Sequence, residues 1–197
     1  MKKIAIIGGI GSGKSVVSKI LRTMGYPVYD CDSNAKRLMA TCGTISDYLI
    51  SEFGQNVFSS DGSINRGFLA EKIFNDSQAL SRLNSVVHPI VKADFAEWVS
   101  QQMSNDLVFV ETAILFESGM DASVDMIWNV EAPVEVRIQR VVLRNNTTPD
   151  AVKARIESQS KQYPRSSIEI KNIDNGGDAA LLPQIDRLLK EALRNRI

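Results

Sequence analysis

Short apolar runs alternate with amphipathic stretches along this chain, as in a sheet with helices packed against it. Residues 3–7 are almost continuously apolar and end at two glycines, which is typical of a strand buried on both faces of a parallel sheet. Residues 14–24 then carry apolar side chains at helical spacing, and Gly25 follows where a helix C-terminal cap is expected. The N-terminal segment therefore predicts a strand, a glycine-rich loop and a helix.

The same two patterns recur to the end of the chain. Thr148 is a good N-cap with Pro149 in the first helical position, for a helix that runs to about Ser160 before a break at residues 162–167 that contains Pro164. An amphipathic last helix follows the turn at residues 174–177. Another helix is expected to begin at Pro133. The further strands expected from short apolar runs are residues 27–29, 107–110, 125–130 and 168–173.

Between about residues 33 and 103 the pattern is mostly helical, with a polar break at residues 59–63 and an amphipathic run at residues 68–74. We interpret this part as an inserted helical region. Its first helix is expected to begin at Asp32 or Ser33 as the N-cap. The chain's one histidine, His88, precedes Pro89 at an expected helix junction, and both a structural hydrogen-bonding role and a substrate contact remain open.

The charge and composition favour a small partner. The chain has 23 basic and 23 acidic residues, so no net field attracts it to nucleic acid or to an anionic membrane. The apolar start is far shorter than a signal or membrane span, and we expect a cytoplasmic protein. The two cysteines lack metal-ligand spacing and are expected to be reduced thiols. No interface can be located from the pattern, so oligomerisation stays open.

Residues 8–15 read Gly-Gly-Ile-Gly-Ser-Gly-Lys-Ser and match the complete G-x-x-x-x-G-K-S pattern of a P-loop, between a strand and a helix. Glycines let backbone amides approach a phosphate, and the start of the helix adds a partial positive charge. Lys14 would bridge the β- and γ-phosphates of ATP, and the Ser15 hydroxyl would ligate the accompanying Mg²⁺. A chance glycine-rich turn is disfavoured because both the string and its context fit.

Acidic residues follow several of the expected strands. The carboxyl ends of parallel strands form one edge of a sheet, where ligands bind. Gly8, Asp32, Glu111 and Glu131 are therefore expected to approach that edge. In kinases, a carboxylate near the γ-phosphate orients the acceptor hydroxyl and takes its proton. We favour Asp32 for this role, whereas Asp30 could equally be a helix N-cap.

Three arginines, Arg137, Arg140 and Arg144, are spaced so that they share one face of the helix expected after Pro133. A basic stripe of this kind is usually only a solvated surface. Here the helix lies beside the proline-containing break, in a segment that could close over the site. An arginine that neutralises the transferring phosphoryl group would then be available, and Arg140 is our first choice.

Taken together, these residues resemble dephospho-coenzyme A kinases, which phosphorylate the ribose 3′-hydroxyl of dephospho-CoA in the last step of coenzyme A synthesis. Residues 8–15 look like the family's P-loop, and residues 30–32 like its D-A-D element. Leu83-Asn84 with His88-Pro89 resembles its L-N…H-P motif. Residues 114–117 resemble its P-L-L-F-E, and residues 174–177 its D-N-x-G turn. The resemblance covers almost the whole chain.

The resemblance implies an α/β fold of the P-loop kinase type, with three α/β/α layers, a parallel sheet, a helical substrate-binding insertion and a small lid. The core would comprise residues 1–32, 104–136 and 168–197, the insertion about 33–103 and the lid about 137–167. Catalysis would involve Asp32, Lys14 and Arg140, and the acceptor side Asp32, His88, Leu115 and Glu117. The residues implied to bind ATP are Gly9, Ile10, Gly11, Ser12, Gly13, Lys14, Ser15, Arg140 and Asn175, with Asn175 near the adenine.

The chain departs from the usual family residues at some positions, namely Ile7, Lys36, Ala113, Arg137 (commonly glutamine) and Glu169-Ile170. None of them touches the phosphate-binding string, Asp32 or Arg140. The nearest rival function is another nucleoside or nucleotide kinase with a different acceptor pocket. A GTPase-type switch would need N-K-x-D and an ABC-type ATPase L-S-G-G-Q, and the chain contains neither string.

Overall fold

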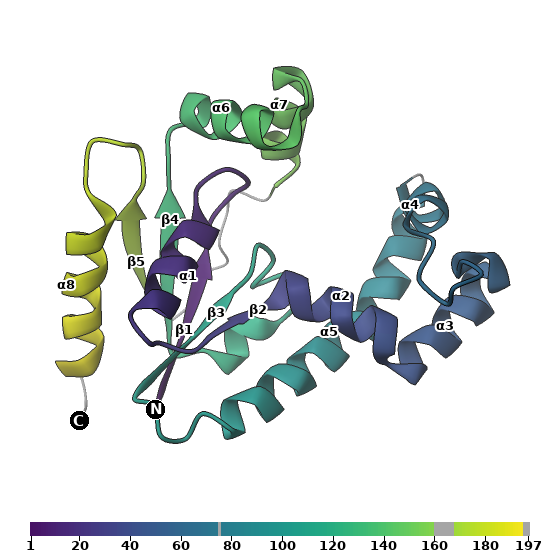
Figure 1. The fold of residues 1–197 in the computed structure, drawn as a ribbon, viewed down its shortest axis with the longest axis horizontal. Helices are drawn as coiled ribbons and strands as arrows, with labels where there is room; N and C mark the ends of the chain where they lie inside the picture. The colour runs from purple at the N-terminus through teal and green to yellow at the C-terminus, as the bar shows by residue number, and fades with distance from the viewer. Residues whose placement is uncertain (75, 160–167, 195–197) are drawn as a thin grey trace. The chain divides into compact units, whose positions relative to one another are not determined.

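A computed structural model describes residues 1–74, 76–159 and 168–194 and contains a five-stranded sheet (Figure 1). The strand order is β2-β3-β1-β4-β5, and all four pairings are parallel. This arrangement confirms the predicted parallel α/β fold. The strands are β1 (Lys2–Ile7), β2 (Val28–Asp30), β3 (Leu107–Glu111), β4 (Met126–Glu131) and β5 (Glu169–Asp174).

Helices α1 (Lys14–Thr23) and α8 (Leu181–Arg194) pack on one face of the sheet. The main hydrophobic core lies between them and the strands, and Phe109 and Trp128 form its aromatic centre with ring centroids 5.1 Å apart. Side chains on the other face, such as Ala5 and Val108, are also fully buried. The sheet is therefore covered on both faces, which is why its strands read as continuous apolar runs.

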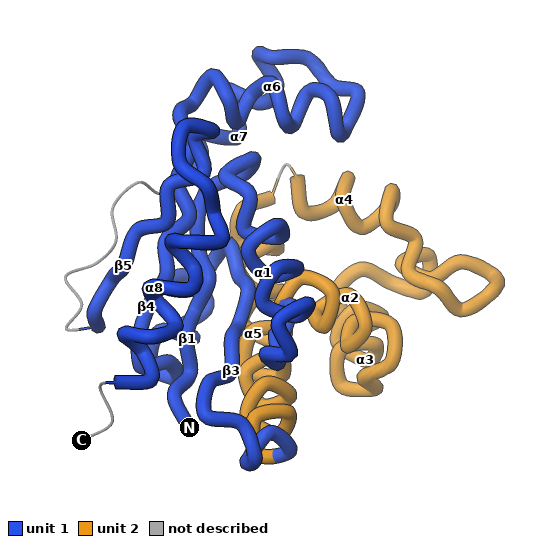
Figure 2. The backbone as a smooth tube through the Cα atoms, turned by 60° about the vertical axis from the view of Figure 1, so that its left-hand side comes forward, with its two compact units in different colours: residues 1–30, 101–197 blue, residues 31–100 orange. Residues whose placement is uncertain are grey.

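The chain divides into two compact units, coloured separately in Figure 2. The first unit comprises Met1–Asp30 and Gln101–Ile197 and holds the sheet. The second is Cys31–Ser100 and is helical: it contains α2 (Cys31–Thr41), α3 (Gly43–Phe53), the 3-10 helix η1 (Gln55–Val57), α4 (Arg66–Phe74) and α5 (Ser77–Ser100). The function assigned to this helical part remains a prediction. In the described ranges, no helix is both long enough and apolar enough to cross a membrane.

Two local predictions in the second unit are wrong. Helix α2 begins at Cys31, so Asp32 lies in its first turn and is not an N-cap. The expected junction at His88-Pro89 does not exist, because α5 continues through Pro89. A proline inside a helix loses one backbone hydrogen bond and crowds the preceding turn. The apolar residues that α5 buries on both sides of Pro89, including Val87 and Val91, offset that cost.

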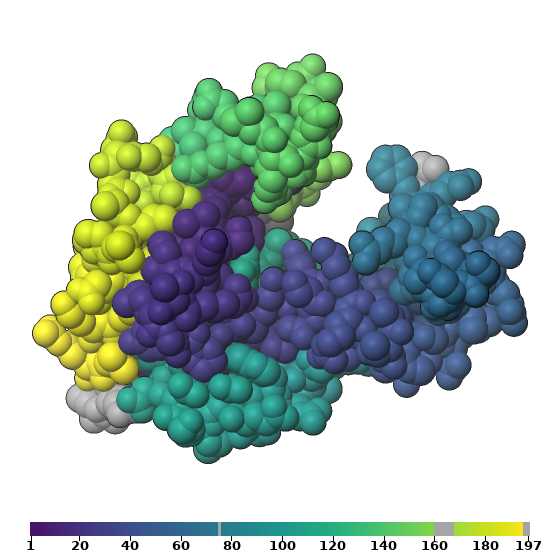
Figure 3. Space-filling view, in the orientation of Figure 1, coloured from purple at the N-terminus to yellow at the C-terminus, as the bar shows by residue number. Residues whose placement is uncertain are grey.

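Helices α6 (Val134–Asn145) and α7 (Pro149–Ser158) form a hairpin in the first unit. As predicted, Thr148 caps α7: its hydroxyl accepts a hydrogen bond from the Ala151 amide at 3.3 Å. Figure 3 shows the hairpin, in green, against the N-terminal segment in purple. The predicted break at residues 162–167 lies outside the described residues. A 3-10 helix, η2 (Met120–Ser123), precedes β4.

Candidate phosphate-binding site

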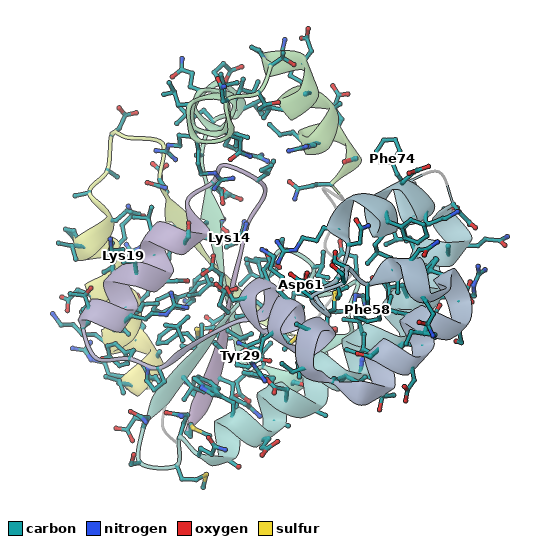
Figure 4. All side chains as sticks on the ribbon, turned by 45° about the vertical axis from the view of Figure 1, so that its right-hand side comes forward. Lys14, Lys19, Tyr29, Phe58, Asp61 and Phe74 are labelled. Carbon is teal, nitrogen blue, oxygen red and sulfur yellow. The ribbon has the colours of Figure 1, made fainter. Side chains whose placement is uncertain are left out.

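The P-loop connects β1 to α1, as the sequence predicts. Gly13 precedes the helix with φ 98°, a left-handed conformation that favours glycine, and provides no side chain to cap the first turn. No capping side chain from Gly13 therefore competes with an anion for the amides at the start of α1. Lys14, labelled in Figure 4, begins the helix. Its ammonium group donates to the Gly8 carbonyl at 2.6 Å and more weakly to that of Gly9 at 3.4 Å.

Asn175 links the P-loop to the helix hairpin. Its side-chain amide donates to the Ser12 carbonyl at 2.7 Å, and its backbone carbonyl accepts a hydrogen bond from Nη2 of Arg140 at 2.9 Å. The other terminal nitrogen of Arg140, Nη1, is buried and has no hydrogen-bond partner among the described residues. A methyl group built on Gly13 would lie 3.9 Å from that nitrogen. A cationic donor that has no partner in the described part of the chain thus lies beside the loop, where a phosphate could satisfy it.

The three predicted arginines divide into two that face the loop and one that faces solvent. Arg137 donates from Nε to the Ile10 carbonyl at 2.8 Å, so the prediction that this departure from the usual family residue does not touch the phosphate-binding string is wrong. Arg140 lies beside Gly13, as described above. Arg144 is exposed and donates to the neighbouring Asn145 side chain at 3.0 Å. Of the three arginines, only Arg137 and Arg140 therefore lie at the P-loop. The spacing of the arginines predicts a shared helix face but does not distinguish these two from Arg144.

The carboxyl ends of the strands meet at one edge, as predicted for Gly8, Glu111 and Glu131. Asp32 belongs to the second unit, so its approach to this edge remains a prediction. Glu111 is level with Ile6 of β1 and pairs in register with Asp30 of β2. Burial raises the pKa of Glu111 above its ordinary value of 4.5; the Asp30 charge adds to the shift, and the Ser18 hydroxyl, Lys14 and Arg22 oppose it. Within the described ranges, no group of three or more His, Cys, Asp or Glu residues could hold a metal ion.

A cavity of about 610 Å³ opens beside the P-loop. Its volume is within the range of small-molecule sites. Its walls come from the P-loop, from β4 and β5 with the residues that follow β4, and from helices α6, α7 and α8. The polar lining residues include Asn129, Glu131, Arg137, Gln159, Asn172, Asp174 and Gln184.

The residues predicted for the acceptor side are divided between the two units. Asp32 is exposed in the first turn of α2, and His88 is half-buried in α5, so both belong to the second unit. Leu115 and Glu117 belong to the first unit, in the turns that follow β3. Leu115 is buried, with 2% of its surface exposed, whereas Glu117 is exposed. Their contacts with an acceptor remain predictions.

Two residues at the loop have no role in the sequence prediction. Glu111 was expected at the sheet edge but was given no function. An acidic residue at the end of a buried strand could have indicated a role at the ligand-binding edge. Gln159 accepts a hydrogen bond from the Ile10 amide at 2.8 Å. A glutamine near the end of an amphipathic helix gives no sequence signal for such a contact, because 149 positions separate the two residues.

Comparisons with known proteins identify the family of this chain. The family model for dephospho-CoA kinase matches residues 2–180. A dephospho-CoA kinase from Bacteroides fragilis is 41% identical over 187 residues, which is 95% of this chain and 91% of that protein. One from Porphyromonas gingivalis is 36% identical over 197 residues, covering 100% and 96% of the two chains.

A solved structure shows the same fold. The crystal structure of TT1252 from Thermus thermophilus superposes with a TM-score of 0.80 at 34% identity, over 100% of this chain and 98% of that one. The family match extends over nearly the whole chain and includes the P-loop, the strand ends and the α6–α7 hairpin. The chain therefore belongs to the dephospho-CoA kinase family.

Proposed function

We propose that this protein transfers the γ-phosphoryl group of ATP to the ribose 3′-hydroxyl of dephospho-CoA, giving coenzyme A and ADP in the last step of coenzyme A synthesis. The observation that carries the proposal is the P-loop, with Lys14 at the uncapped start of α1 and Arg140 beside it, in a chain of this family. The alternative is another P-loop kinase that acts on a nucleoside or nucleotide.

The donor half of the reaction rests on the contacts around the loop. The amides at the start of α1 would bind the β-phosphate, and Lys14 would exchange its bonds to the Gly8 and Gly9 carbonyls for phosphate oxygens. The adjacent cavity would receive the nucleoside, and Asn175, beside that cavity's Asp174, would lie near the adenine. The buried Nη1 of Arg140 would bond to the transferring phosphoryl group and stabilise its charge in the transition state.

Magnesium would accompany the nucleotide and would neutralise charge that develops on its phosphates. The oxygen donors near the start of α1 suit this hard cation. Ser15 is exposed in the first turn and would provide a hydroxyl ligand. The Glu111 carboxyl, close enough to Lys14 for an electrostatic interaction, would hold the ion directly or through water.

The acceptor half is proposed from the matching motifs. Asp32 would accept the proton of the attacking hydroxyl, which is the role of a carboxylate in this kind of transfer. His88, Leu115 and Glu117 would contribute to binding of dephospho-CoA. Because Leu115 is buried, it would act mainly by supporting the exposed Glu117 two residues further along the same turns.

The test of the acceptor is a substrate panel. Purified protein with ATP and Mg²⁺ is given dephospho-CoA, a set of nucleosides or a set of nucleoside monophosphates, and kcat/KM is measured for each. Dephospho-CoA should be preferred by at least about 10³-fold, because unpaired polar groups in a site reject the wrong acceptor. A higher kcat/KM for any nucleoside or nucleotide would overturn the acceptor assignment. It would not affect the proposal that the P-loop binds ATP.

The test of the base compares two neighbouring carboxylates. Asp32→Asn should retain ATP affinity and lower kcat by about 10²- to 10⁴-fold. Asp30→Asn serves as the matched variant, because Asp30 ends β2 only two residues earlier. If Asp30→Asn lowers kcat and Asp32→Asn does not, the base is Asp30.

A further inference from the structure

The apex of the P-loop is held by both helices of the α6–α7 hairpin through one residue. The Ile10 amide donates to Oε1 of Gln159, just after α7, at 2.8 Å. The Ile10 carbonyl accepts from Nε of Arg137, on α6, at 2.8 Å. Both backbone groups of Ile10 are thus bonded to side chains of the hairpin. We call these three residues the Ile10 clamp.

Packing around the clamp joins the loop to the hairpin further. The Ile10 side chain packs against a small apolar cluster made by Val141, Val152 and Ile156. The neighbouring Gly11 has φ 78°, and a methyl group built there would lie 2.6 Å from the Arg137 carbonyl and 2.9 Å from Val141 Cγ2. The backbone of the loop therefore lies directly on α6, at a distance that only glycine allows.

A glycine-rich loop needs such an external constraint. Glycine loses more backbone freedom on ordering than any other residue, so a loop with four glycines among residues 8–13 resists adopting one conformation. A site that is already ordered avoids this cost when its ligand binds. The clamp bonds to the amide and carbonyl of one residue only, and it uses none of the amides at the start of α1.

We propose that Gln159 and Arg137 are positioning residues for the phosphate-binding loop, and that they order it for ATP through the backbone of Ile10. Neither residue needs to touch the reacting atoms for this effect. The inference rests on the proposed ATP site, but it does not depend on which acceptor the enzyme uses. A consequence is that any movement of the hairpin away from the loop would weaken phosphate binding.

Gln159 is the better residue to test, because its contribution to the clamp is one neutral hydrogen bond, whereas Arg137 also brings a positive charge to the loop. Because both residues line the cavity, the hydrogen-exchange measurement below separates positioning of the loop from direct contact with the nucleotide. Gln159→Met removes the acceptor and keeps the length of the side chain. Gln139→Met is the matched control, since Gln139 is an exposed glutamine on α6 outside the clamp. Binding of ADP with Mg²⁺ is measured by calorimetry, together with KM for both substrates and the thermal midpoint.

Gln159→Met should weaken ADP binding by about three- to tenfold, the value expected for loss of one hydrogen bond. KM for ATP should rise by a similar factor, and KM for dephospho-CoA and the thermal midpoint should match those of Gln139→Met. Unchanged ADP affinity would overturn the inference. An equal rise in both KM values would also overturn it, because that result indicates general structural damage.

A second measurement isolates the bond itself. Hydrogen exchange at the Ile10 amide should accelerate in Gln159→Met and stay slow in Gln159→Glu, which retains an acceptor oxygen. Equal exchange in the two variants would contradict the clamp. Failure of the proposed function gives a different result from failure of the clamp. If ADP binding depends on Gln159 as described but dephospho-CoA is not phosphorylated, the clamp is supported and the acceptor assignment is wrong. A parent chain that does not bind ADP would refute both.

Discussion

The sheet core and the α6–α7 hairpin of the first unit differ in how they are held together. Strands β1, β3, β4 and β5 and helices α1 and α8 share one large cluster of buried apolar residues. The hairpin, as far as the described residues show, has a cluster of three buried residues, Val141, Val152 and Ile156, and is otherwise joined to the loop by polar contacts. We therefore expect the core to provide most of the stability, and the hairpin to provide Arg140 to the proposed reaction and to open locally.

Within this comparison of core and hairpin, the largest effect we expect comes from the hairpin and concerns the reaction rate alone. Arg140→Met should lower kcat by about 10³-fold, because an arginine that stabilises the transferring phosphoryl group contributes that much or more. The thermal midpoint should change little. Arg144→Met, one turn further along α6 and exposed, should stay within about twofold of the parent in kcat, as expected for a solvated side chain. Equal losses from both variants, measured by steady-state kinetics, would contradict the assignment.

The same substitution in the two regions should give different losses of stability. Ile185→Ala, in the core on α8, should lower the free energy of unfolding by about 2 to 5 kcal/mol. Ile156→Ala should lower it by less, because the loss cannot exceed the free energy that the hairpin needs to open locally. Urea denaturation measures both values. Hydrogen exchange should accelerate only in α6 and α7 for Ile156→Ala, and equal global losses would refute the comparison.

These two regions also differ in how well the sequence predicts them. Buried strands have a local signature, so β1, β3 and β4 were expected close to their observed bounds, and the P-loop string predicts a phosphate site in the loop that joins β1 to α1. Thr148-Pro149 likewise predicted the start of α7. In contrast, the bonds from Arg137 and Gln159 to Ile10 join residues far apart in the chain, and a polar residue on a helix gives no periodic signal for its partner.

Pro89 shows a second reason for error. A proline usually marks the end of a helix, because the ring removes a hydrogen bond and crowds the preceding turn. In α5 the apolar residues on either side of Pro89 are buried along one long helix, so tertiary packing overrides the local preference. The expected junction was therefore wrong for a reason that only the packing of the second unit could reveal.

A smaller effect should come from the cap of α7. Thr148→Ala removes the hydroxyl that accepts from the Ala151 amide, and loss of an N-cap costs about 1 kcal/mol. If the hairpin opens locally, this loss should appear as faster hydrogen exchange of the α7 amides. Exchange of the β4 amides should change little or not at all. Thr148→Ser should retain the cap and the parent exchange pattern. Uniformly faster exchange throughout the first unit would mean that the hairpin and core unfold together.

The smallest effect should appear at the sheet edge as a dependence on pH. Burial raises the pKa of Glu111, so the folded state holds its proton more tightly than the unfolded state, and stability falls as pH rises through the folded-state pKa. Glu111→Gln removes this cost. The variant should be more stable than the parent at neutral pH, and the difference should vanish below the ordinary glutamate value of 4.5. Urea titrations across pH measure it, and a difference independent of pH would contradict the account.

The central claim is that this P-loop donates the γ-phosphoryl group of ATP to dephospho-CoA. The most direct measurement incubates the protein with Mg²⁺, dephospho-CoA and ATP labelled in the γ-phosphoryl group, and locates the label in the product by mass spectrometry and phosphorus NMR. The account predicts coenzyme A with the label at the ribose 3′-position and one ADP per product. Release of labelled inorganic phosphate with unmodified dephospho-CoA would contradict it.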